Sequence, residues 1–460
     1  MSTSTRRPTT SAASRYARGE TGGGAPPDPH PFWVGLESPL STYYLLIAVI
    51  SSLTLIGLVV VLSSSSVTSL KAGNPAYSLF MKQAQFAVLG TVGAFVASRL
   101  PVSAWKKLAF PIFCVAVFLQ LLVHTPVGVE VNGNRNWIQL PGMQLQPSEI
   151  GKFALVLCIA LGLATKRRRL HEWQHVVVPA LVPFGAIIVG LTLLGRDLGT
   201  ALILLAIIAG LLWAAGVSWK LFVAAGGLFG ALAAVMVLVS GNRMSRIDQW
   251  LNCTDVHQCW QTRHGQFALA DGGILGRGLG NSVEKWLWLP EPQNDFIYAI
   301  IGEELGLWGA LLVLALYALL ALACYRIVMQ SDDQFVRLAT TGVMVWILVQ
   351  AMINIGSVIG LLPVIGVPLP LVSYGGSALV TNLGALGMVI SFARSEPACR
   401  RALAVRPVAW RRSLETVHLP GLTRRRLAPV PATSDEPPVT SARTRTTRRA
   451  RPTPPTRKDK

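Results

Sequence analysis

Charged side chains are scarce in this sequence. They make up 14% of the 460 residues, against 52% apolar residues, whereas soluble domains have about 25% charged residues. This scarcity excludes an ordinary soluble protein. The charges that exist are unevenly placed, because the last 66 residues hold sixteen Lys or Arg against five Asp or Glu. The formal net charge of +19 therefore indicates basic segments beside a membrane and no nucleic-acid partner.

No cleavable signal peptide is visible in this sequence either. The first 40 residues are polar, rich in Gly and Pro, and carry four arginines, so we expect a disordered cytoplasmic segment at 1–40. A transmembrane domain is predicted at 41–395. The remainder, 396–460, is predicted to be a basic, disordered cytoplasmic tail.

Long apolar runs fill the middle of the chain. A helix needs about 20 apolar residues to cross roughly 30 Å of hydrocarbon, and backbone groups in lipid must bond within the segment. The sequence therefore predicts an all-α polytopic integral membrane protein with about ten transmembrane helices. The expected spans are 43–62, 79–99, 108–124, 148–165, 176–194, 198–216, 220–240, 297–325, 335–362 and 376–394.

Basic residues between the spans predict the orientation. They gather on one side of the predicted membrane, which the positive-inside rule makes cytoplasmic. With ten spans, both termini are then cytoplasmic. These basic residues are Lys106, Lys107, Lys166, Arg167, Arg168, Arg169, Lys220, Arg326 and Arg337, with the tail. The loops expected to face outward are 63–78, 125–147, 241–296 and 363–375.

Cysteines are few, and only two share a loop. Cys253 and Cys259 both lie in the outer loop 241–296, and the other four lie in apolar spans or the tail. An oxidising exterior allows this pair to form a disulfide. Free thiols are the alternative, because sequence spacing does not supply the required geometry.

Several ionisable residues lie at predicted membrane boundaries. Glu149 and Lys152 are three residues apart and therefore share a helix face. They form either a structural ion pair or one wall of a polar cleft, since intramembrane charges normally face a partner or a water-filled cavity. Two further charged sites, Glu303 with Glu304 and Arg196 with Asp197, favour the cleft.

Two single residues are ambiguous by themselves. Asp295 precedes a span and could be a solvated helix cap, and Trp137 could be an interfacial belt residue. The glycine-rich stretch GGILGRGLG at 272–280 does not indicate a nucleotide site, because no strand precedes it and it faces outward.

Taken in order, four motifs resemble the SEDS family (shape, elongation, division and sporulation). They are NGNRNWIQL followed by QPSEIGK, then DLGTA at 197–201, GLGNSVEKWLWLPEPQNDFIYAIIGEELGLWG at 278–309, and NIG with LPVIGVPLPLVSYGGSAL at 354–379. The resemblance extends from about residue 40 to 395. The residues of the last two motifs are most similar to those of division-type members, and elongation-type members are the alternative.

The resemblance implies a peptidoglycan glycosyltransferase that polymerises lipid II, the lipid-linked disaccharide-pentapeptide precursor. It acts at the outer face of the bacterial cytoplasmic membrane, at the division septum. The aspartate of the family's TDFIF motif corresponds to Asp295, which is therefore the catalytic candidate, as general base. The implied substrate-binding residues are Trp137, Arg135, Glu149, Lys152, Arg196, Asp197, Lys285, Glu303, Ser373 and Ser377.

The sequence departs from the family pattern near these candidates. Asn294 replaces the Thr of TDFIF, Arg196 stands where a Pro is usual, and Ile365 replaces a frequent Lys. For the diphosphate leaving group we prefer Lys152 over Arg135, Arg196 and Lys285. No cluster of ligands requires a metal or another cofactor, although a divalent cation could share the diphosphate charge.

Other functions and partners follow as alternatives and expectations. A lipid flippase or transporter would also carry intramembrane charges, but it should show an internal repeat, and none is convincing.

The family implies a class B penicillin-binding protein, a single-span transpeptidase, as activating partner. The basic tail is expected to bind anionic lipids or other division proteins, with plain solvation as the alternative.

Overall fold

The computed structural model describes residues 40–405, with the exception of 132, 141–142, 167–182, most positions between 218 and 258, and 287. The predicted segment 1–40, apart from Leu40, lies outside the described residues. So do the tail beyond residue 405 and most of the predicted span 220–240.

Apolar helices dominate the described residues, and seven of them are long enough to cross a membrane. They are α2 (Ser41–Lys71), α3 (Ser78–Ala97), α4 (Val102–Val123), α5 (Pro147–Thr165), α12 (Ile297–Gln330), α13 (Gln334–Val358) and α14 (Gly376–Ser395). Two shorter apolar helices, Pro183–Leu194, which includes α7 (Ile187–Leu194), and α8 (Leu198–Ala214), match two further predicted spans. The helical membrane fold is therefore confirmed.

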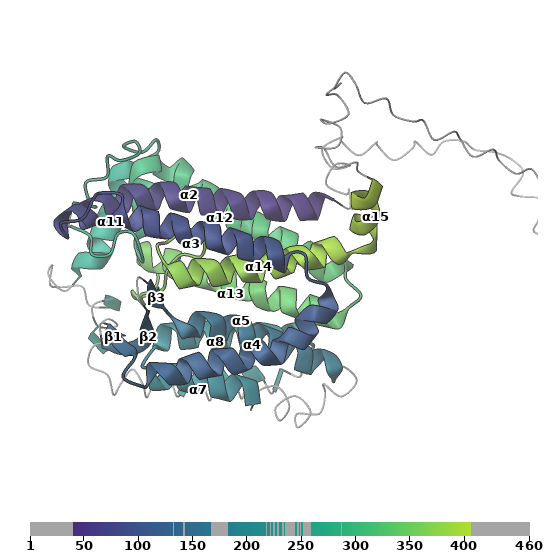
Figure 1. Ribbon diagram of the computed structural model, residues 1–460. Helices are drawn as coiled ribbons and strands as arrows, with labels where there is room; N and C mark the ends of the chain where they lie inside the picture. Colours follow the sequence, from purple (N-terminus) through teal and green to yellow (C-terminus); the bar gives the residue numbers. More distant parts are fainter. Residues whose placement is uncertain are drawn as a thin grey trace, which may run out of the picture. The chain divides into compact units, whose positions relative to one another are not determined.

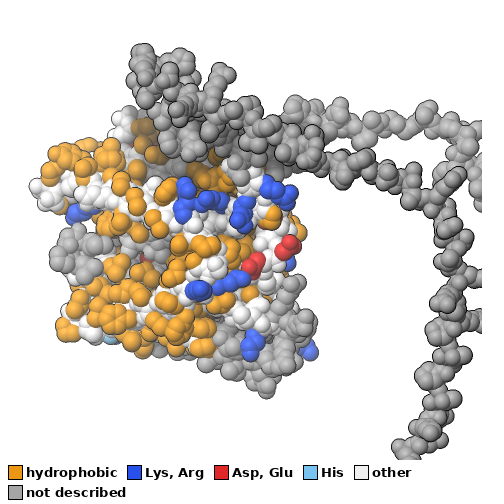
Figure 2. All heavy atoms as spheres, turned by 45° about the vertical axis from the view of Figure 1, so that its right-hand side comes forward, with side chains coloured by type: hydrophobic (Ala, Val, Ile, Leu, Met, Phe, Trp, Pro, Cys, Tyr) orange, Lys and Arg blue, Asp and Glu red, His pale blue; other side chains and the backbone are white. Residues whose placement is uncertain are grey.

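The surface of the bundle fits contact with lipid. Only 17% of the apolar window of α3 and 28% of that of α4 are buried, so most of their side chains are at least partly accessible at the surface of the bundle. Figure 2 shows a largely hydrophobic face, with Lys and Arg gathered toward one end of the bundle. A protein that crosses the membrane several times is expected to have such a surface.

The prediction of an outer loop at 63–78 was wrong in its first half. α2 continues to Lys71, because serine hydroxyls in this stretch bond back to carbonyls within the helix, as Ser66 does to Ser63 over 2.8 Å. The stretch also packs against α12. Its buried serines are Ser64, Ser65 and Ser69.

α4 also begins earlier than predicted, at Val102 instead of residue 108. Lys106 and Lys107 therefore lie in its first two turns and not in a loop. Lys106 donates to Asp333, the N-cap of α13, over 2.7 Å. A lysine can occupy the end of a membrane helix in this way because its aliphatic stem packs on apolar surface while its ammonium reaches a polar partner.

The outer loops contain regular structure that the sequence did not predict. The loop 125–147 forms an antiparallel sheet of β1 (Gly128–Val131), β2 (Asn134–Leu140) and β3 (Met143–Leu145), in the order β1-β2-β3. The loop 241–296 contains α11 (Trp260–Gly272). Figure 1 shows the strands and α11 at one end of the bundle, and α15 (Pro397–Val405) at the other.

A break interrupts α12 near its start. Gly306 has φ 69° and ψ −165°, a conformation that an L-residue with a side chain rarely adopts. The outer loop fills the break, because Arg277 donates its backbone N–H to Glu303 and Leu307 donates to Gly273, each over 2.9 Å. The two turns of α12 before Gly306 are therefore bonded to the outer loop.

Candidate active site

The segment 365–377, which leads from α13 into α14, contains two of the predicted site residues, Ser373 and Ser377. It holds the turn before α12 through two bonds. The Ser373 hydroxyl donates to the Asn294 carbonyl over 2.6 Å, and the Tyr374 N–H donates to the Gln293 carbonyl over 2.9 Å. Ser373 is buried, so its structural role is to fix the backbone that presents Asp295.

α13 supports the same turn from a second side. The Asn354 side-chain amide donates to the carbonyl of Asp295 and to that of Val367, each over 2.8 Å. Asp295 is half-buried and lies two residues before the first residue of α12. Its backbone is thus fixed in three dimensions, which is what a positioned catalytic side chain requires.

One turn earlier on α13, Gln350 joins the 365–377 segment to α5. Its amide nitrogen donates to Pro368 over 2.9 Å, and its oxygen accepts from Lys152 over 2.8 Å. Lys152 also donates to Glu149 over 2.9 Å, and its ammonium lies 5.1 Å from the ring centre of Trp346. The predicted Glu149–Lys152 pair therefore exists and faces α13.

This pair is deeply buried. Lys152 is 1% exposed and Glu149 2%. One carboxylate oxygen of Glu149, Oε2, has no hydrogen-bond partner among the described residues. A buried charge without a partner is costly. The ammonium of Lys152 is paired by Glu149 and Gln350, and its bond to Gln350 joins α5 to α13.

Asp197 forms the N-cap of α8 and joins three elements. Its carboxylate accepts from the Thr200 N–H over 2.9 Å and from the Thr200 hydroxyl over 2.7 Å. It also accepts from Asn136 of β2 over 2.8 Å and from Gln146 over 3.2 Å. The Gln146 N–H in turn donates to Ser377 over 3.3 Å. The structure therefore gives Asp197 and Ser377 connecting roles.

Arg135 on β2 is joined to the turn that carries Arg196, at the end of the bundle that bears the strands. The Arg135 N–H donates to the carbonyl of Gly195, the residue before Arg196, over 3.0 Å. Arg196 is exposed and has a φ of 61°. Trp137, next to these residues on β2, is half-buried and pairs with Val129 in the sheet. A guanidinium group suits an anionic substrate group, so both arginines stay candidates for such a contact.

Lys285, Glu303 and Glu304 form a second cluster, between the outer loop and α2. Lys285 bonds to Glu304 over 3.3 Å and to the Ser63 hydroxyl over 3.1 Å. Glu303 accepts from the Ser282 hydroxyl and the Val283 N–H, each over 2.6 Å. Lys285 is 4% exposed and Glu303 0%, so both serve to hold the outer loop on the bundle.

The sequence did not single out the amides that position the site. Gln350 and Asn354 stand one turn apart on one face of a membrane helix, a spacing that indicates a shared polar contact. His264 and Glu284 were also missed: they are 2.6 Å apart, and the imidazole packs against both Trp260 and Trp288, with ring centres 4.2 and 5.7 Å away. Burial raises the pKa of Glu284, and the bond from His264 partly offsets this effect.

Cys259 is disulfide-bonded; its predicted partner, Cys253, lies outside the described residues. The cysteines that remain free are Cys114, Cys158, Cys324 and Cys399. Within the described ranges no group of three or more His, Cys, Asp or Glu side chains could hold a metal ion. A divalent cation at the site remains a prediction.

Comparison with known proteins places this arrangement in context. A family model described as "Cell cycle protein", covering FtsW, RodA and SpoVE, matches residues 43–397. A probable peptidoglycan glycosyltransferase FtsW from Mycobacterium tuberculosis is 39% identical over 374 residues, which are 81% of this chain and 71% of that protein.

Solved structures give the same picture. A structure described as "Structural coordination of polymerization and crosslinking by a peptidoglycan synthase complex" matches with a TM-score of 0.63 at 27% identity, covering 77% of this chain and 98% of that chain. The rod shape determining protein RodA of Thermus thermophilus matches with a TM-score of 0.57 at 28% identity, covering 80% of this chain and 99% of that one.

Proposed function

The chain belongs to the SEDS family, the cell cycle proteins that include FtsW, RodA and SpoVE, and on this premise we propose that it is a division-type peptidoglycan glycosyltransferase with Asp295 as its general base. The observation that carries the assignment is the fixed turn before α12. Asn354, Ser373 and Tyr374 all bond to the backbone of residues 293–295, and the side chain that this turn presents is the half-buried Asp295.

The chemistry needs a base at this place. Lipid II already carries a good leaving group, a diphosphate on its anomeric carbon, but the acceptor sugar hydroxyl is a weak nucleophile. The Asp295 carboxylate takes the proton of the acceptor's 4-hydroxyl group while the oxygen of that hydroxyl attacks the anomeric carbon of the donor. The bond to the diphosphate breaks, the diphosphate leaves with the electron pair, and the configuration inverts. Positioned proton transfer typically contributes about 10²–10⁴-fold.

The departing diphosphate needs cations. Of the predicted candidates, Lys152 and Lys285 already have buried carboxylate partners. Arg196 is exposed and Arg135 is half-buried, and the backbone N–H of Arg135 bonds to the carbonyl of Gly195, next to Arg196. We therefore assign the diphosphate to the two arginines, and we give Lys152 the role of setting the position of α5.

The direct test is polymerisation of lipid II by purified protein in detergent, with its transpeptidase partner. Asp295→Asn removes the base but keeps the shape of the side chain, so glycan synthesis should fall by about 10²–10⁴-fold. Detergent provides no second compartment, so a flippase would make no polymer under these conditions.

Asp333→Asn is the matched control. Asp333 is the N-cap of α13, at the end of the helix bundle far from Asp295. Asn is an equally good capping residue. This control should polymerise at the wild-type rate. Wild-type activity in Asp295→Asn would contradict the assignment of the base.

We propose that a class B penicillin-binding protein acts with this chain. The supporting observation is its likeness to a chain of a peptidoglycan synthase complex, whose description couples polymerisation to crosslinking. Co-purification of the two proteins, and higher glycan synthesis by the pair than by this chain alone, would support the partnership.

We also propose that the end of the bundle bearing α15 is cytoplasmic and that the protein acts at the division septum. Lys and Arg gather toward one end of the described surface (Figure 2), and positive residues favour the cytoplasmic side. Cysteine-labelling of intact cells tests the orientation. Removal of residues 406–460 should leave polymerisation intact and should disturb septal localisation if the tail binds division proteins or anionic lipids.

A further inference from the structure

The helix α11 of the outer loop packs on the bundle through small residues. Its buried residues are Gly265, Ala268 and Gly272, and they let the helix lie close to α12. An added Cβ at Gly272 would lie 1.9 Å from the carbonyl oxygen of Gly302. The aromatic residues of α11 are therefore not needed for this contact.

These aromatic residues lie on a different face of α11. Trp260, His264 and Phe267 follow one another at intervals of four and three residues, which places them along one side of a helix. The ring centre of His264 is 4.2 Å from that of Trp260 and 5.7 Å from that of Phe267. Phe267 is 51% exposed, so this side of α11 is open. We call these three residues, together with Trp288 of the same outer loop, the aromatic platform.

Trp288 packs against α11 with one face of its indole. Its ring is inclined by 25° to that of Trp260 and by 19° to that of His264, with ring centres 5.6 and 5.7 Å away. Two rings on opposite faces of an indole would be further apart than two stacked rings, whereas Trp260 and His264 are 4.2 Å apart. Both therefore lie toward one face of Trp288. Since Trp288 is 47% exposed, its other face is available to a ligand.

A polar pair accompanies the rings. His264 Nδ1 lies 2.6 Å from a carboxylate oxygen of Glu284, and Glu284 is buried. Whichever of the two groups holds the hydrogen, the other ring nitrogen of His264, Nε2, has no hydrogen bond within the described part of the chain. The His264 side chain is 15% exposed. Nε2 is therefore able to bond a hydroxyl group, which both donates and accepts.

Several bonds hold the platform in place. Cys259, which is disulfide-bonded, is the N-cap of α11 and directly precedes Trp260. Trp260 Nε1 donates to the Trp288 carbonyl over 2.5 Å. The Leu289 N–H donates to the Glu284 carbonyl over 3.0 Å, which returns the chain at Trp288 toward Glu284. A surface that is fixed in advance loses little entropy when a ligand binds.

Two connections place the platform near the proposed base. Trp288 precedes Asp295 by seven positions, so the two residues are at most about 25 Å apart. The helix α11 also packs on Phe296, the residue after Asp295, because a Cβ at Gly265 would lie 3.0 Å from its ring. A chain of a few sugars that extends from Asp295 would therefore reach the platform.

We propose that the aromatic platform binds the growing glycan strand, an oligosaccharide of N-acetylated amino sugars; this inference rests on the proposed function. The C–H groups on one face of a sugar ring pack on an indole, whose π face is negative, while a sugar hydroxyl bonds to His264. Insertion into hydrocarbon is disfavoured, because Nε2 would lose its bonds to water there. Such a site retains the strand after each transfer, so that the same strand is extended.

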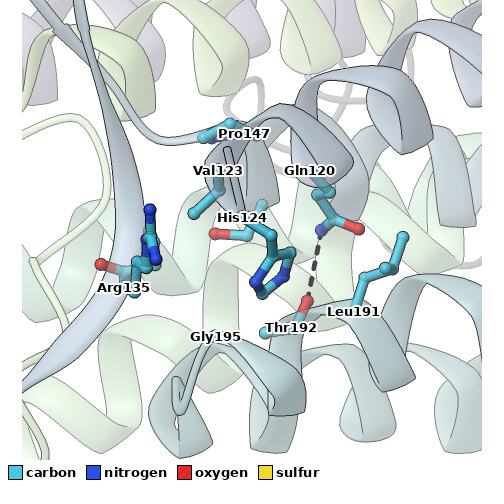
Figure 3. A pocket seen from close by; sticks show the side chains of 10 residues that line it. Gln120, Val123, His124, Arg135, Pro147, Leu191, Thr192 and Gly195 are labelled. Carbon is cyan, nitrogen blue, oxygen red and sulfur yellow. Dashed lines mark hydrogen bonds between the residues drawn. The ribbon is translucent and has the colours of Figure 1, made fainter. Parts of the chain in front are cut away.

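The small pocket between α4, β2, α5 and α7 does not compete for this role (Figure 3). It has room for about one water molecule. Two of its polar side chains, Gln120 and Thr192, bond to each other over 3.2 Å. A sugar ring is too large for it, whereas the platform is open.

Binding of a soluble β-linked oligomer of N-acetylglucosamine tests the platform directly. The oligomer has no diphosphate, so it binds without reacting. An NMR titration of full-length protein in detergent should give a dissociation constant about 3- to 10-fold higher for Trp288→Ala, the effect of losing one aromatic stacking contact. This variant keeps the carbonyl that holds Trp260. Trp288→Tyr keeps a stacking ring and should bind as the wild type does.

The length of the glycan strands gives a second measurement. In polymerisation of lipid II with the transpeptidase partner, Trp288→Ala should release shorter strands, which gel electrophoresis resolves. Phe267→Ala removes the exposed ring at the end of the α11 face and supplies both tests if Trp288→Ala does not fold.

Trp286→Ala is the matched control. Trp286 lies in the same loop and is 61% exposed, but it is not one of the rings of the platform. This variant should bind the oligomer, and should set strand length, as the wild type does.

The outcomes separate the two proposals. Weaker oligomer binding and shorter strands in Trp288→Ala, with neither change in Trp288→Tyr or Trp286→Ala, support the glycan site. Equal oligomer binding in all the proteins would overturn it, and so would a loss in Trp286→Ala as large as that in Trp288→Ala. Failure of the wild type to polymerise lipid II would instead contradict the proposed function, and the binding titration does not depend on catalysis.

Discussion

The side-chain amide of Asn354 donates to the backbone carbonyl of Asp295 over 2.8 Å, although the two residues are 59 positions apart in the chain. The same amide nitrogen donates to Val367. A single side chain within α13 therefore fixes the turn that carries Asp295 to the 365–377 segment. Its loss leaves two carbonyl groups without this donor and releases the turn from α13.

Asn354→Leu should lower kcat about 10- to 100-fold, because misplacement of a catalytic group by about 1 Å can cost two orders of magnitude. KM should change little, since Asn354 acts on the backbone of Asp295 and not on the substrate. The measurement is steady-state polymerisation of lipid II. Ser391→Ala, which removes a buried bond to Trp105 in another part of the bundle, is the control. A parallel rise of KM in Asn354→Leu would argue for direct substrate contact instead.

The Glu149–Lys152 pair should matter more for stability than any exposed pair. Lys152→Met leaves a buried carboxylate without its cation, so we expect a loss of about 3–5 kcal/mol. Lys106→Met breaks a pair whose side chains are 37% and 40% exposed and should cost less than about 1 kcal/mol. Thermal unfolding in one detergent compares the two variants. Similar melting temperatures would show that the pair is not a structural element.

Gly306→Ala tests the break in α12. An added Cβ would lie 2.4 Å from the backbone nitrogen of Gly276, at a φ of +69°, so the outer loop must move and both stability and activity should fall. Gly93→Ala is the matched control, because a Cβ there meets nothing within 4 Å. It should be neutral or stabilising by about 0.5–1 kcal/mol. Unchanged melting in both variants would mean that the loop yields without cost.

The outer loop should also respond to pH through Glu284. Burial raises the pKa of Glu284 above its usual 4.5, so the folded loop favours the protonated acid. Its contribution to stability is complete below pH 4.5 and is lost as pH rises through the raised pKa. Amide exchange of residues 282–288, corrected for intrinsic rates, should therefore speed up over this range. Glu284→Gln should flatten the dependence, and an equal slope in that variant would exclude Glu284 as the source.

The sequence predicts the presence of the membrane helices well but places several of their ends incorrectly. Apolar runs reveal helices directly, because lipid leaves the backbone no other partner. The stretch after residue 62 lies outside the apolar run and therefore predicts a loop, yet its serines bond to carbonyls of their own helix, and the helix packs on α12. The sequence does not predict the strands at 128–145, because they are short and lie in a stretch rich in Gly and Asn.

For the site, the sequence pointed to ionisable residues and overlooked neutral amides. Resemblance predicts Asp295, Ser373 and Ser377 as site residues, and the structure places all three beside or within the 365–377 segment. Lys285 and Glu303 were grouped with them, but they hold the outer loop against α2. No spacing rule separates these groups, because the difference arises from tertiary contacts across more than 200 residues, such as that between Ser63 and Lys285.

The break at Gly306 places the two turns that follow Asp295 between two anchors. The outer loop bonds to them at Glu303 and Glu304, and Asn354 of α13 bonds to the turn that precedes them. Leu307, on the other side of the break, bonds to Gly273 of the same loop. A rearrangement of this loop would therefore reach both the backbone that follows Asp295 and the long membrane-crossing part of α12.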